Sequence, residues 1–298
     1  MPDAGAWGFV DDRGAAVAAA RRPERVVAYV RAGAALRDLG VTPVAVYGSG
    51  HDGGVLDPVK AGGLEAAGVP YLGPGRGLDE EALRELRPDL VVDVTYAGKS
   101  PYALEEAVAE RIGVPLVALS VGGESNLAAI IGRFGELGAA LRPADGAALP
   151  EPLSGPRELA SAEEAVRAVV ADGGGGVAVL ALSGAASDRV HLARPPAWPE
   201  LARLAELGVR LVDPGPGPGA NWLTADWEHA ARLGPDLVLF DSRANAVRPA
   251  DLPPVGHARV ASWNPETPPS PAAYARFFRD LADALRAERA SAGDGLTR

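Results

Sequence analysis

Short apolar runs alternate along the chain with stretches in which apolar positions repeat at helical spacing. The apolar runs predict buried strands at 25–30, 43–47, 89–93, 115–120, 177–183, 209–212, 236–241 and 258–263. The intervening stretches predict helices at 32–39, 79–86, 101–112, 124–141, 161–172, 198–207, 226–233 and 271–289. Strands that alternate with helices form parallel sheets, so the pattern predicts an α/β fold.

One phrase occurs twice, at half-chain spacing. Residues 88–93 read Pro-Asp-Leu-Val-Val-Asp, and residues 235–241 read Pro-Asp-Leu-Val-Leu-Phe-Asp. Each copy follows a short helical stretch and leads into a polar loop. The repeat predicts two Rossmann-like lobes with mainly parallel sheets, whose strand ends line a ligand cleft between the lobes.

The helical stretch near the middle of the chain divides these lobes. We expect an N-terminal lobe at 1–123, one long linker helix at 124–142 and a C-terminal lobe at 143–298. Residues 143–156 are Pro-rich and predict a surface connection. Residues 7–19 predict a hairpin around Asp11-Asp12-Arg13-Gly14; a metal loop is the other interpretation of this turn.

Composition narrows the possible functions. The chain has 298 residues, a hydrophobic fraction of 47% and a net charge of −10. The acidic balance argues against nucleic acid and against an anionic membrane surface as partners. The chain has no cysteine, which excludes disulfides, thiolate nucleophiles and Cys-ligated zinc. Abundant Ala, Gly and Pro, with Arg in place of Lys, are typical of a high-GC bacterium.

The N-terminus shows no export signal, because residues 1–5 lack a basic region and an apolar segment. Two interpretations remain open. The protein is cytoplasmic if Met1 is the native start. If a signal was trimmed, it is an extracytoplasmic, membrane-anchored lipoprotein.

Several phrases, in their order and spacing, carry a resemblance to a known family. They are Phe9-Val10-Asp11-Asp12-Arg13-Gly14, Pro23-Glu24-Arg25-Val26-Val27-Ala28, Leu204-Ala205-Glu206-Leu207-Gly208-Val209 and Phe240-Asp241-Ser242-Arg243. The chain resembles the iron-siderophore substrate-binding proteins of ABC importers, which have a periplasmic binding protein fold with one helix between the lobes. The resemblance implies capture of a ferric siderophore, which we expect to be of the hydroxamate type, and delivery to an ABC importer permease by a monomer.

The family docks on its permease through one surface glutamate in each lobe. The matching residues here are Glu81 and Glu228, which stand at the same distance before the two Pro-Asp phrases. Asp79 and Asp226 precede them as expected helix N-caps. An acidic first turn also stabilises a helix without any partner, so both interpretations stay open.

A ferric siderophore needs aromatic faces and hydrogen-bond donors, while its iron stays bound to the siderophore. We therefore expect no cofactor and no metal ligands from the protein. Candidate ligand-binding residues follow predicted strands: Tyr47, His51, Tyr96, Lys99, Ser183, Trp222, Arg243 and Trp263. We place Trp222 in a loop. For Arg243 a salt bridge with Asp241 is the alternative, and for Trp263 the packed core.

No catalytic motif is found, and the four histidines have no metal-ligand spacing, which disfavours a manganese or zinc site. Two alternatives to siderophore capture remain. The fold could serve in the cytosol as an enzyme or carrier in a natural-product pathway, with His51, Lys99, Asp241 or Arg243 as acid–base candidates. It could also bind cobalamin or haem.

Overall fold

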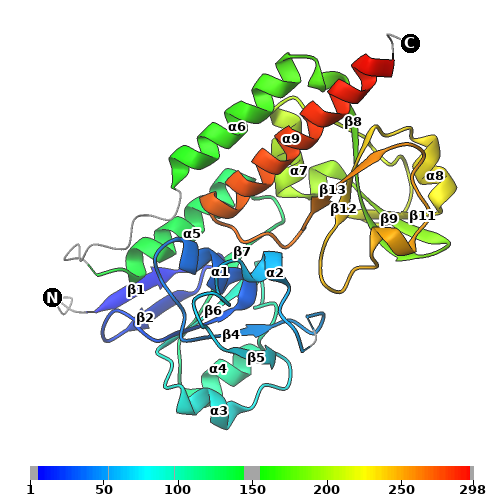
Figure 1. Cartoon of the computed structure of the whole chain (residues 1–298). Coiled ribbons are helices and arrows are strands. Elements are labelled where there is room, and N and C mark those ends of the chain that lie inside the picture. Colours follow the sequence, from blue (N-terminus) through cyan, green and yellow to red (C-terminus); the bar gives the residue numbers. More distant parts are fainter. Residues whose placement is uncertain (1–5, 53, 97, 144–154, 296–298) are drawn as a thin grey trace. The chain divides into compact units, whose positions relative to one another are not determined.

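The structure is a computed structural model that describes residues 6–52, 54–96, 98–143 and 155–295 (Figure 1). The chain forms two compact units. Unit 1 comprises Met1–Gly155 and the later segment Glu266–Ala273, and unit 2 comprises Pro156–Pro265 and Tyr274–Arg298. The lobe boundaries and the linker helix given above stay predictions. Most of the predicted connection at 143–156 lies outside the described residues.

Unit 1 is built on a parallel sheet with the strand order β5-β4-β3-β6-β7. Its strands are β3 (Val26–Tyr29), β4 (Ala45–Gly48), β5 (Tyr71–Pro74), β6 (Leu90–Thr95) and β7 (Leu116–Ser120). Strands β3, β4 and β6 are buried along their whole length, as continuous apolar runs predict. The predicted parallel sheet is therefore confirmed, and β5 is an addition that the sequence pattern did not reveal.

Helices cover both faces of this sheet (Figure 1). They are α1 (Val30–Asp38), α2 (Pro58–Ala61), α3 (Glu80–Glu85), α4 (Glu106–Ile112) and α5 (Leu127–Leu141). Helix α1 packs against α2 and α5, while α3 packs against α4. Helix α4 begins later than its predicted start at residue 101, because the N–H groups of Ala103 and Leu104 bond to the Asp93 carboxylate.

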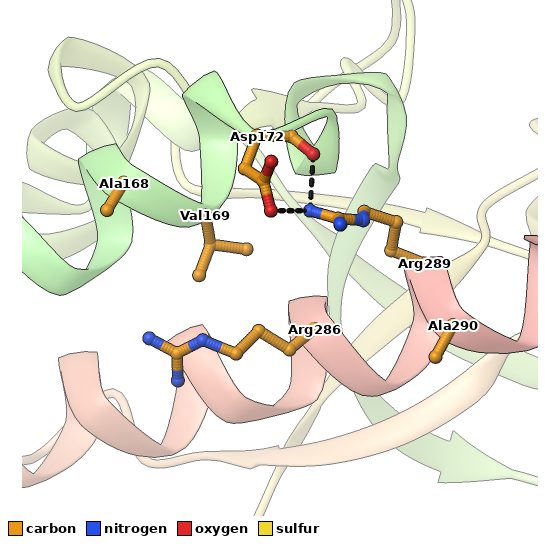
Figure 2. Close-up of a pocket in the computed structure, with 6 residues that line it drawn as sticks. All are labelled: Ala168, Val169, Asp172, Arg286, Arg289 and Ala290. Carbon is orange, nitrogen blue, oxygen red and sulfur yellow. Dashed lines mark hydrogen bonds and ion pairs between the residues drawn. The ribbon is translucent and has the colours of Figure 1, made fainter.

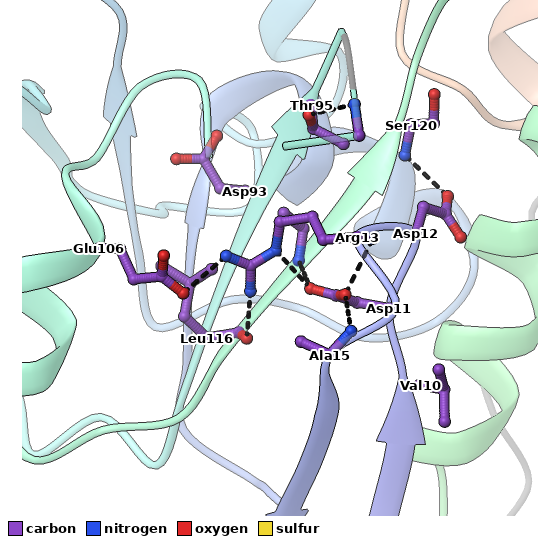
Figure 3. Close-up of polar contacts among 12 residues, drawn as sticks. Val10, Asp11, Asp12, Arg13, Ala15, Asp93, Thr95, Glu106, Leu116 and Ser120 are labelled. Atoms are coloured by element: carbon purple, nitrogen blue, oxygen red, sulfur yellow. Dashed lines mark hydrogen bonds and ion pairs between the residues drawn. The ribbon is translucent and has the colours of Figure 1, made fainter. Parts of the chain in front are cut away.

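A hairpin of β1 (Trp7–Val10) and β2 (Ala16–Ala19) precedes the sheet, as predicted. Figure 3 shows how its turn is held. Asp11 accepts hydrogen bonds from the N–H groups of Arg13, Ala15 and Ala118, and the Arg13 guanidinium bonds to Asp11 and Glu106. The Asp11 carboxylate in the turn therefore accepts hydrogen bonds from the protein itself, and β1 pairs with β2, which confirms the hairpin interpretation.

Unit 2 contains a mixed sheet with the order β11-β9-β8-β12-β13, in which β10 also pairs with β8. Its strands are β8 (Ala178–Ala186), β9 (Arg189–Ala193), β10 (Arg210–Leu211), β11 (Trp222–Ala225), β12 (Leu237–Asp241) and β13 (Arg259–Trp263). Strands β10, β8, β12 and β13 are parallel, whereas β9 is antiparallel to β8 and β11.

Strands β9 and β11 correct the prediction from sequence. Trp222 is the first residue of β11 and does not lie in a loop. The short phrase Trp-Leu-Thr-Ala has no long apolar run, and its strand conformation comes from pairing with β9, which local pattern does not show.

The helices of unit 2 are α6 (Pro156–Ala171), α7 (Pro199–Glu206), α8 (Trp227–Arg232) and α9 (Pro271–Gly295), with short 3₁₀ turns at Gly174–Gly176, Pro195–Ala197 and Pro249–Asp251. Helices α6 and α9 lie side by side (Figure 1) and are joined by an ion pair between Arg279 and Glu158 at 3.5 Å. Helix α8 places Trp227 against Leu180, Leu182 and Phe240 on one face of the sheet.

The two Pro-Asp phrases adopt the same local structure. Asp89 accepts the N–H of Arg25 at the start of β3, and Asp236 accepts the N–H of Ala178 at the start of β8. Each phrase therefore connects its strand to the neighbouring parallel strand. The predicted repeat of helix, Pro-Asp, strand and loop is thereby found in both units.

Candidate functional site

Four tyrosines gather at the carboxyl end of the unit 1 sheet. The ring centroids of Tyr29 and Tyr47 are 6.3 Å apart, those of Tyr29 and Tyr102 5.7 Å, and those of Tyr96 and Tyr102 4.9 Å. Tyr29 and Tyr47 are fully buried, whereas Tyr96 is 39% exposed. We call these four residues the tyrosine cluster; Tyr96 is its solvent-facing member.

Asp93 is a buried hydrogen-bond acceptor beside the tyrosine cluster. It is buried near the end of β6 and accepts a hydrogen bond from the Tyr47 hydroxyl at 3.1 Å. Its other donors are the N–H groups of Val94, Ala103 and Leu104. Burial raises the pKa of Asp93 to about 6, although these hydrogen bonds oppose the change. Asp93 thus fixes the segment that carries Tyr102.

Buried charges lie beside the tyrosine cluster. The Lys60 ammonium is ion-paired with both Asp52 and Glu266 and lies 5.6 Å from the Tyr29 ring centroid. Burial opposes ionisation of Asp52, but hydrogen bonds from Lys60 and from Ser49 outweigh it and lower the pKa of Asp52. One buried ammonium group therefore pairs with two carboxylates within unit 1.

Arg31 connects the same region to the returning segment of unit 1. Its Nε donates to the Thr267 carbonyl at 3.0 Å, and its Nη1 donates to the Tyr96 hydroxyl at 3.4 Å. Arg31, Tyr29 and Tyr102 are not among the candidate residues predicted from the sequence. The rule that selected Tyr47 also finds Tyr29, because both stand at the end of a buried strand.

His51 and Lys99 lie on exposed loops that follow β4 and β6. Within the described part of the chain, neither side chain forms a hydrogen bond or ion pair. The backbone N–H of His51 bonds to Ser49. Their proposed role in ligand binding stays a prediction.

A polar row crosses the unit 2 sheet at the carboxyl end of its parallel strands. Trp263 on β13 pairs in register with Asp241 on β12, and Ser183 on β8 pairs with His191 on β9. Asp241 stands one residue beyond the pair of Phe240 with Leu182, which places it beside Ser183. Side chains in register share one face of a sheet, so this row forms a single surface.

Three tryptophans pack together on this surface. The ring centroids of Trp198 and Trp222 are 4.8 Å apart, those of Trp198 and Trp263 5.4 Å, and those of Trp222 and Trp263 5.8 Å. The Trp263 indole donates to the buried carboxylate of Glu200 at 3.1 Å. We call Trp198, Trp222 and Trp263 the tryptophan cluster; Trp198 is not among the candidate residues selected from the sequence.

Arg243 follows the polar row. Its Nη2 lies 2.6 Å from Asp241, and its Nε donates to the same carboxylate at 3.0 Å. Burial, with the nearby charges of Arg189 and Arg243, lowers the pKa of His191, so this ring is neutral near pH 7. The structure thus brings together Ser183, Trp222, Arg243 and Trp263, whose role in ligand binding stays a prediction.

Glu81 and Glu228, the predicted docking residues, are exposed in the first turns of α3 and α8. Glu81 forms an ion pair with Arg84 at 3.4 Å, and Glu228 forms one with Arg232 at 2.7 Å. The expected caps are present, since Asp79 accepts the N–H of Glu81 and Asp226 that of His229. The structure contains no partner, so docking stays a prediction.

A hollow of about 360 Å³ lies between α6 and α9 (Figure 2). It is lined by Ala168, Val169, Asp172, Arg286, Arg289 and Ala290. Arg289 is ion-paired with Asp172, and Arg286 with Asp283 at 2.5 Å. Because Asp172 precedes β8, the hollow lies at the amino end of the parallel strands of unit 2, away from the tryptophan cluster. We assign no ligand to it.

Among the described residues, no group of His, Asp or Glu is arranged to hold a metal ion. The described helices also include none with the length and apolar character of a membrane span. The carboxyl ends of the strands in the two sheets carry aromatic side chains and hydrogen-bond donors, which suit the binding of an organic ligand.

No protein-family model matches the chain, and a search of curated proteins finds no match. Solved structures do match. DesE, a ferric-siderophore receptor protein from Streptomyces coelicolor, is 27% identical, with a TM-score of 0.78 over 94% of this chain and 97% of that one. The catecholate-siderophore binding protein VctP from Vibrio cholerae is 14% identical, with a TM-score of 0.62 over 95% and 99%.

A periplasmic heme binding protein from Pseudomonas aeruginosa also matches, at 18% identity and a TM-score of 0.57, over 88% of this chain and 92% of that one. These likenesses extend over nearly the whole chain. The resemblance inferred from sequence is confirmed: this chain has the two-lobe α/β fold of periplasmic binding proteins, and its structural neighbours include ferric-siderophore receptors.

Proposed function

We propose that this protein captures a ferric siderophore for delivery to an ABC importer. The observation that carries the proposal is the likeness to DesE at 27% identity over nearly the full length of both chains. Tyr96, Trp198 and Trp222 support it, because they are the exposed or partly exposed aromatic side chains at the carboxyl ends of the parallel sheets, where α/β proteins bind their ligands. Binding of this kind requires no catalytic group.

The charges at the carboxyl ends of the strands in the two sheets favour a hydroxamate siderophore. Hydroxamate groups carry one negative charge each, so a full set cancels the charge of ferric iron, whereas catecholates carry two and leave a strongly anionic complex. The cations Lys60 and Arg243 are already paired with carboxylates, whereas the exposed Lys99 forms no ion pair within the described part of the chain. A ligand near neutrality suits such a site better than a trianion, which requires cations of its own.

In this proposal the iron stays within its siderophore and is cargo. In unit 2 the Arg243 guanidinium contacts polar oxygens of the complex, and the partly exposed rings of Trp198 and Trp222 contact its organic periphery. In unit 1 the Tyr96 hydroxyl is the candidate hydrogen-bonding group. The protein acts outside the cytoplasm as a monomer, and Glu81 and Glu228 meet arginines of the permease. Lipoprotein anchoring belongs to the same proposal.

Tryptophan fluorescence tests the proposal directly, because Trp198 and Trp222 are only partly buried. Purified protein is titrated with ferric tris-hydroxamates, a ferric tris-catecholate, haem and cobalamin. We expect quenching with a sub-micromolar midpoint for a tris-hydroxamate and weaker binding of the others. Quenching by haem or cobalamin alone would show that the ligand is one of these compounds and not a siderophore. No response to any compound would contradict the proposal that the protein captures such a ligand.

A matched pair of variants locates the response. Trp222→Phe should weaken binding of the tris-hydroxamate about fivefold, since a stacked tryptophan contributes on the order of 1 kcal/mol. Trp7→Phe is the control, because Trp7 is buried in the hairpin of unit 1 and its indole donates to the Ala140 carbonyl at 3.0 Å. It should bind like the unmodified protein.

A further inference from the structure

The loop before Trp222 has an unusual sequence, Asp213-Pro214-Gly215-Pro216-Gly217-Pro218-Gly219, yet its conformation is closely specified. The φ angles of its three glycines are 91°, 152° and 95°. A Cβ atom on Gly217 would lie 2.4 Å from Leu223, and one on Gly219 would lie 2.2 Å from the Trp222 carbonyl oxygen. Only glycine fits this backbone at both positions.

One side chain binds all three glycine carbonyls. Nη1 of Arg194 donates to Gly215, Nη2 to Gly217 and Nε to Gly219, each at 2.9 Å. The planar guanidinium presents its donors in a fixed fork, so it matches carbonyl groups that alternate along a curved backbone. A lysine at this position would satisfy fewer of them.

Two further hydrogen bonds fasten the end of the same loop. The Arg194 N–H and the Trp198 indole both donate to the Asn221 carbonyl, at 2.9 and 3.1 Å. Asn221 directly precedes Trp222, whose ring contacts Trp198 and Trp263. The position of the Trp222 ring is therefore set by a loop whose shape depends on Arg194.

We infer that Arg194 is a positioning residue, which holds the 213–221 loop so that Trp222 presents a preformed aromatic face to the ligand. The part of this inference that concerns the ligand rests on the proposed function. A preformed face raises affinity because the loop loses little conformational freedom on binding. Arg194 itself needs no contact with the ligand.

The test compares two arginine-to-lysine variants of the full chain. Arg194→Lys keeps the positive charge and removes the fork. Arg210→Lys is the control, because the Arg210 guanidinium donates to a single carbonyl, that of Gly176, at 2.9 Å elsewhere in unit 2. Hydrogen exchange of the free protein should become faster for the 215–222 amides in Arg194→Lys and stay unchanged in Arg210→Lys.

Ligand affinity is then measured with the ferric tris-hydroxamate that binds the unmodified protein most tightly. We expect Arg194→Lys to raise Kd about tenfold at an unchanged melting temperature. In the double variant that combines Arg194→Lys with Trp222→Leu, the loss of affinity should equal that of Trp222→Leu alone, because Arg194 acts through the Trp222 ring. An unchanged Kd in Arg194→Lys, or additive losses in the double variant, would overturn the inference.

Failure of the proposed function gives a different result. The unmodified protein would then bind no ferric siderophore, while the exchange experiment would still decide whether Arg194 holds the loop. Unchanged exchange in Arg194→Lys overturns the inference even if the unmodified protein binds its ligand tightly.

Discussion

Asp93 and Asp241 lie on corresponding strands of the two units, one residue apart in the register of the repeat, and they have different partners. Both are buried near the carboxyl end of the strand that follows a Pro-Asp phrase. Asp93 accepts hydrogen bonds from the Tyr47 hydroxyl and backbone N–H groups. Asp241 instead forms a salt bridge with Arg243, two residues further along the chain. The repeated motif thus places a buried carboxylate near the carboxyl end of a strand in each unit. The residues that follow the strand determine which groups donate hydrogen bonds to that carboxylate.

The difference shows how a repeated element takes on separate tasks. After β6 the chain returns over the sheet, so that Asp93 becomes the anchor of the Ala103 and Leu104 backbone. Arg243 stands two residues after the end of β12, and its side chain is 26% exposed. The first carboxylate therefore organises a loop, while the second orients a solvent-accessible cation.

Replacing each carboxylate by alanine should separate these roles most clearly. Asp93→Ala leaves the Tyr47 hydroxyl and buried N–H groups unsatisfied; removal of a buried charge offsets part of this loss, so we expect about 3 kcal/mol less stability. Asp241→Ala frees a partly exposed arginine and should cost about 1 kcal/mol. Urea unfolding measures both values, and equal losses would contradict the distinction.

The pH dependence of stability sharpens the comparison. The pKa of Asp93 is about 6 in the folded protein, above its ordinary value of 3.8, so the folded state binds the proton more tightly. Its contribution is therefore more favourable at pH 5 than at pH 7, by about 1 kcal/mol.

Unfolding of the unmodified protein and of Asp93→Ala at both pH values isolates this contribution, because the other carboxyl groups cancel in the difference. The stability advantage of the unmodified protein should increase as the pH is lowered. A constant advantage, or one that decreases toward pH 5, would show that burial does not govern this carboxyl.

The smallest effect concerns the residue before each Pro-Asp phrase. Both residues have positive φ, 47° at Arg87 and 61° at Gly234. Glycine adopts this conformation freely, whereas arginine is strained in it. Arg87→Gly should therefore raise the stability by about 0.5 kcal/mol, and Gly234→Ala should lower it by about 1 kcal/mol. Thermal unfolding of both variants checks the pair; a loss of stability in Arg87→Gly would refute the assignment of strain.

Sequence patterns predicted the elements that depend on local signals. Buried parallel strands such as β6 and β12 appear as apolar runs, and the caps Asp79 and Asp226 are visible in the sequence. Strand β9 was missed although it pairs with the end of β8 across a short turn between Ala186 and Arg189. Strand β11 escaped prediction because its pairing with β9 joins residues distant in the sequence. The start of α4 was misplaced for a similar reason, since Asp93 competes for the N–H groups of its first predicted turn.

The candidate site follows the same division. Tyr47, Tyr96 and Trp263 were found because they end or follow strands, a property of the local sequence. Trp198 and Arg194 were missed because their importance comes from contacts with the 215–222 segment, which no local pattern reveals. The buried pairing of Lys60 with Glu266 spans most of the chain and is visible only in three dimensions.

The return of Glu266–Ala273 to unit 1 has a consequence for biosynthesis. This segment supplies Glu266 to Lys60, a carbonyl to Arg31 and the Ser270 hydroxyl to Asp38. During translation, unit 1 lacks these partners until almost the whole chain has left the ribosome. The first half of the protein is therefore completed by its last part, and a gene fragment that ends near residue 155 would encode an unfinished domain.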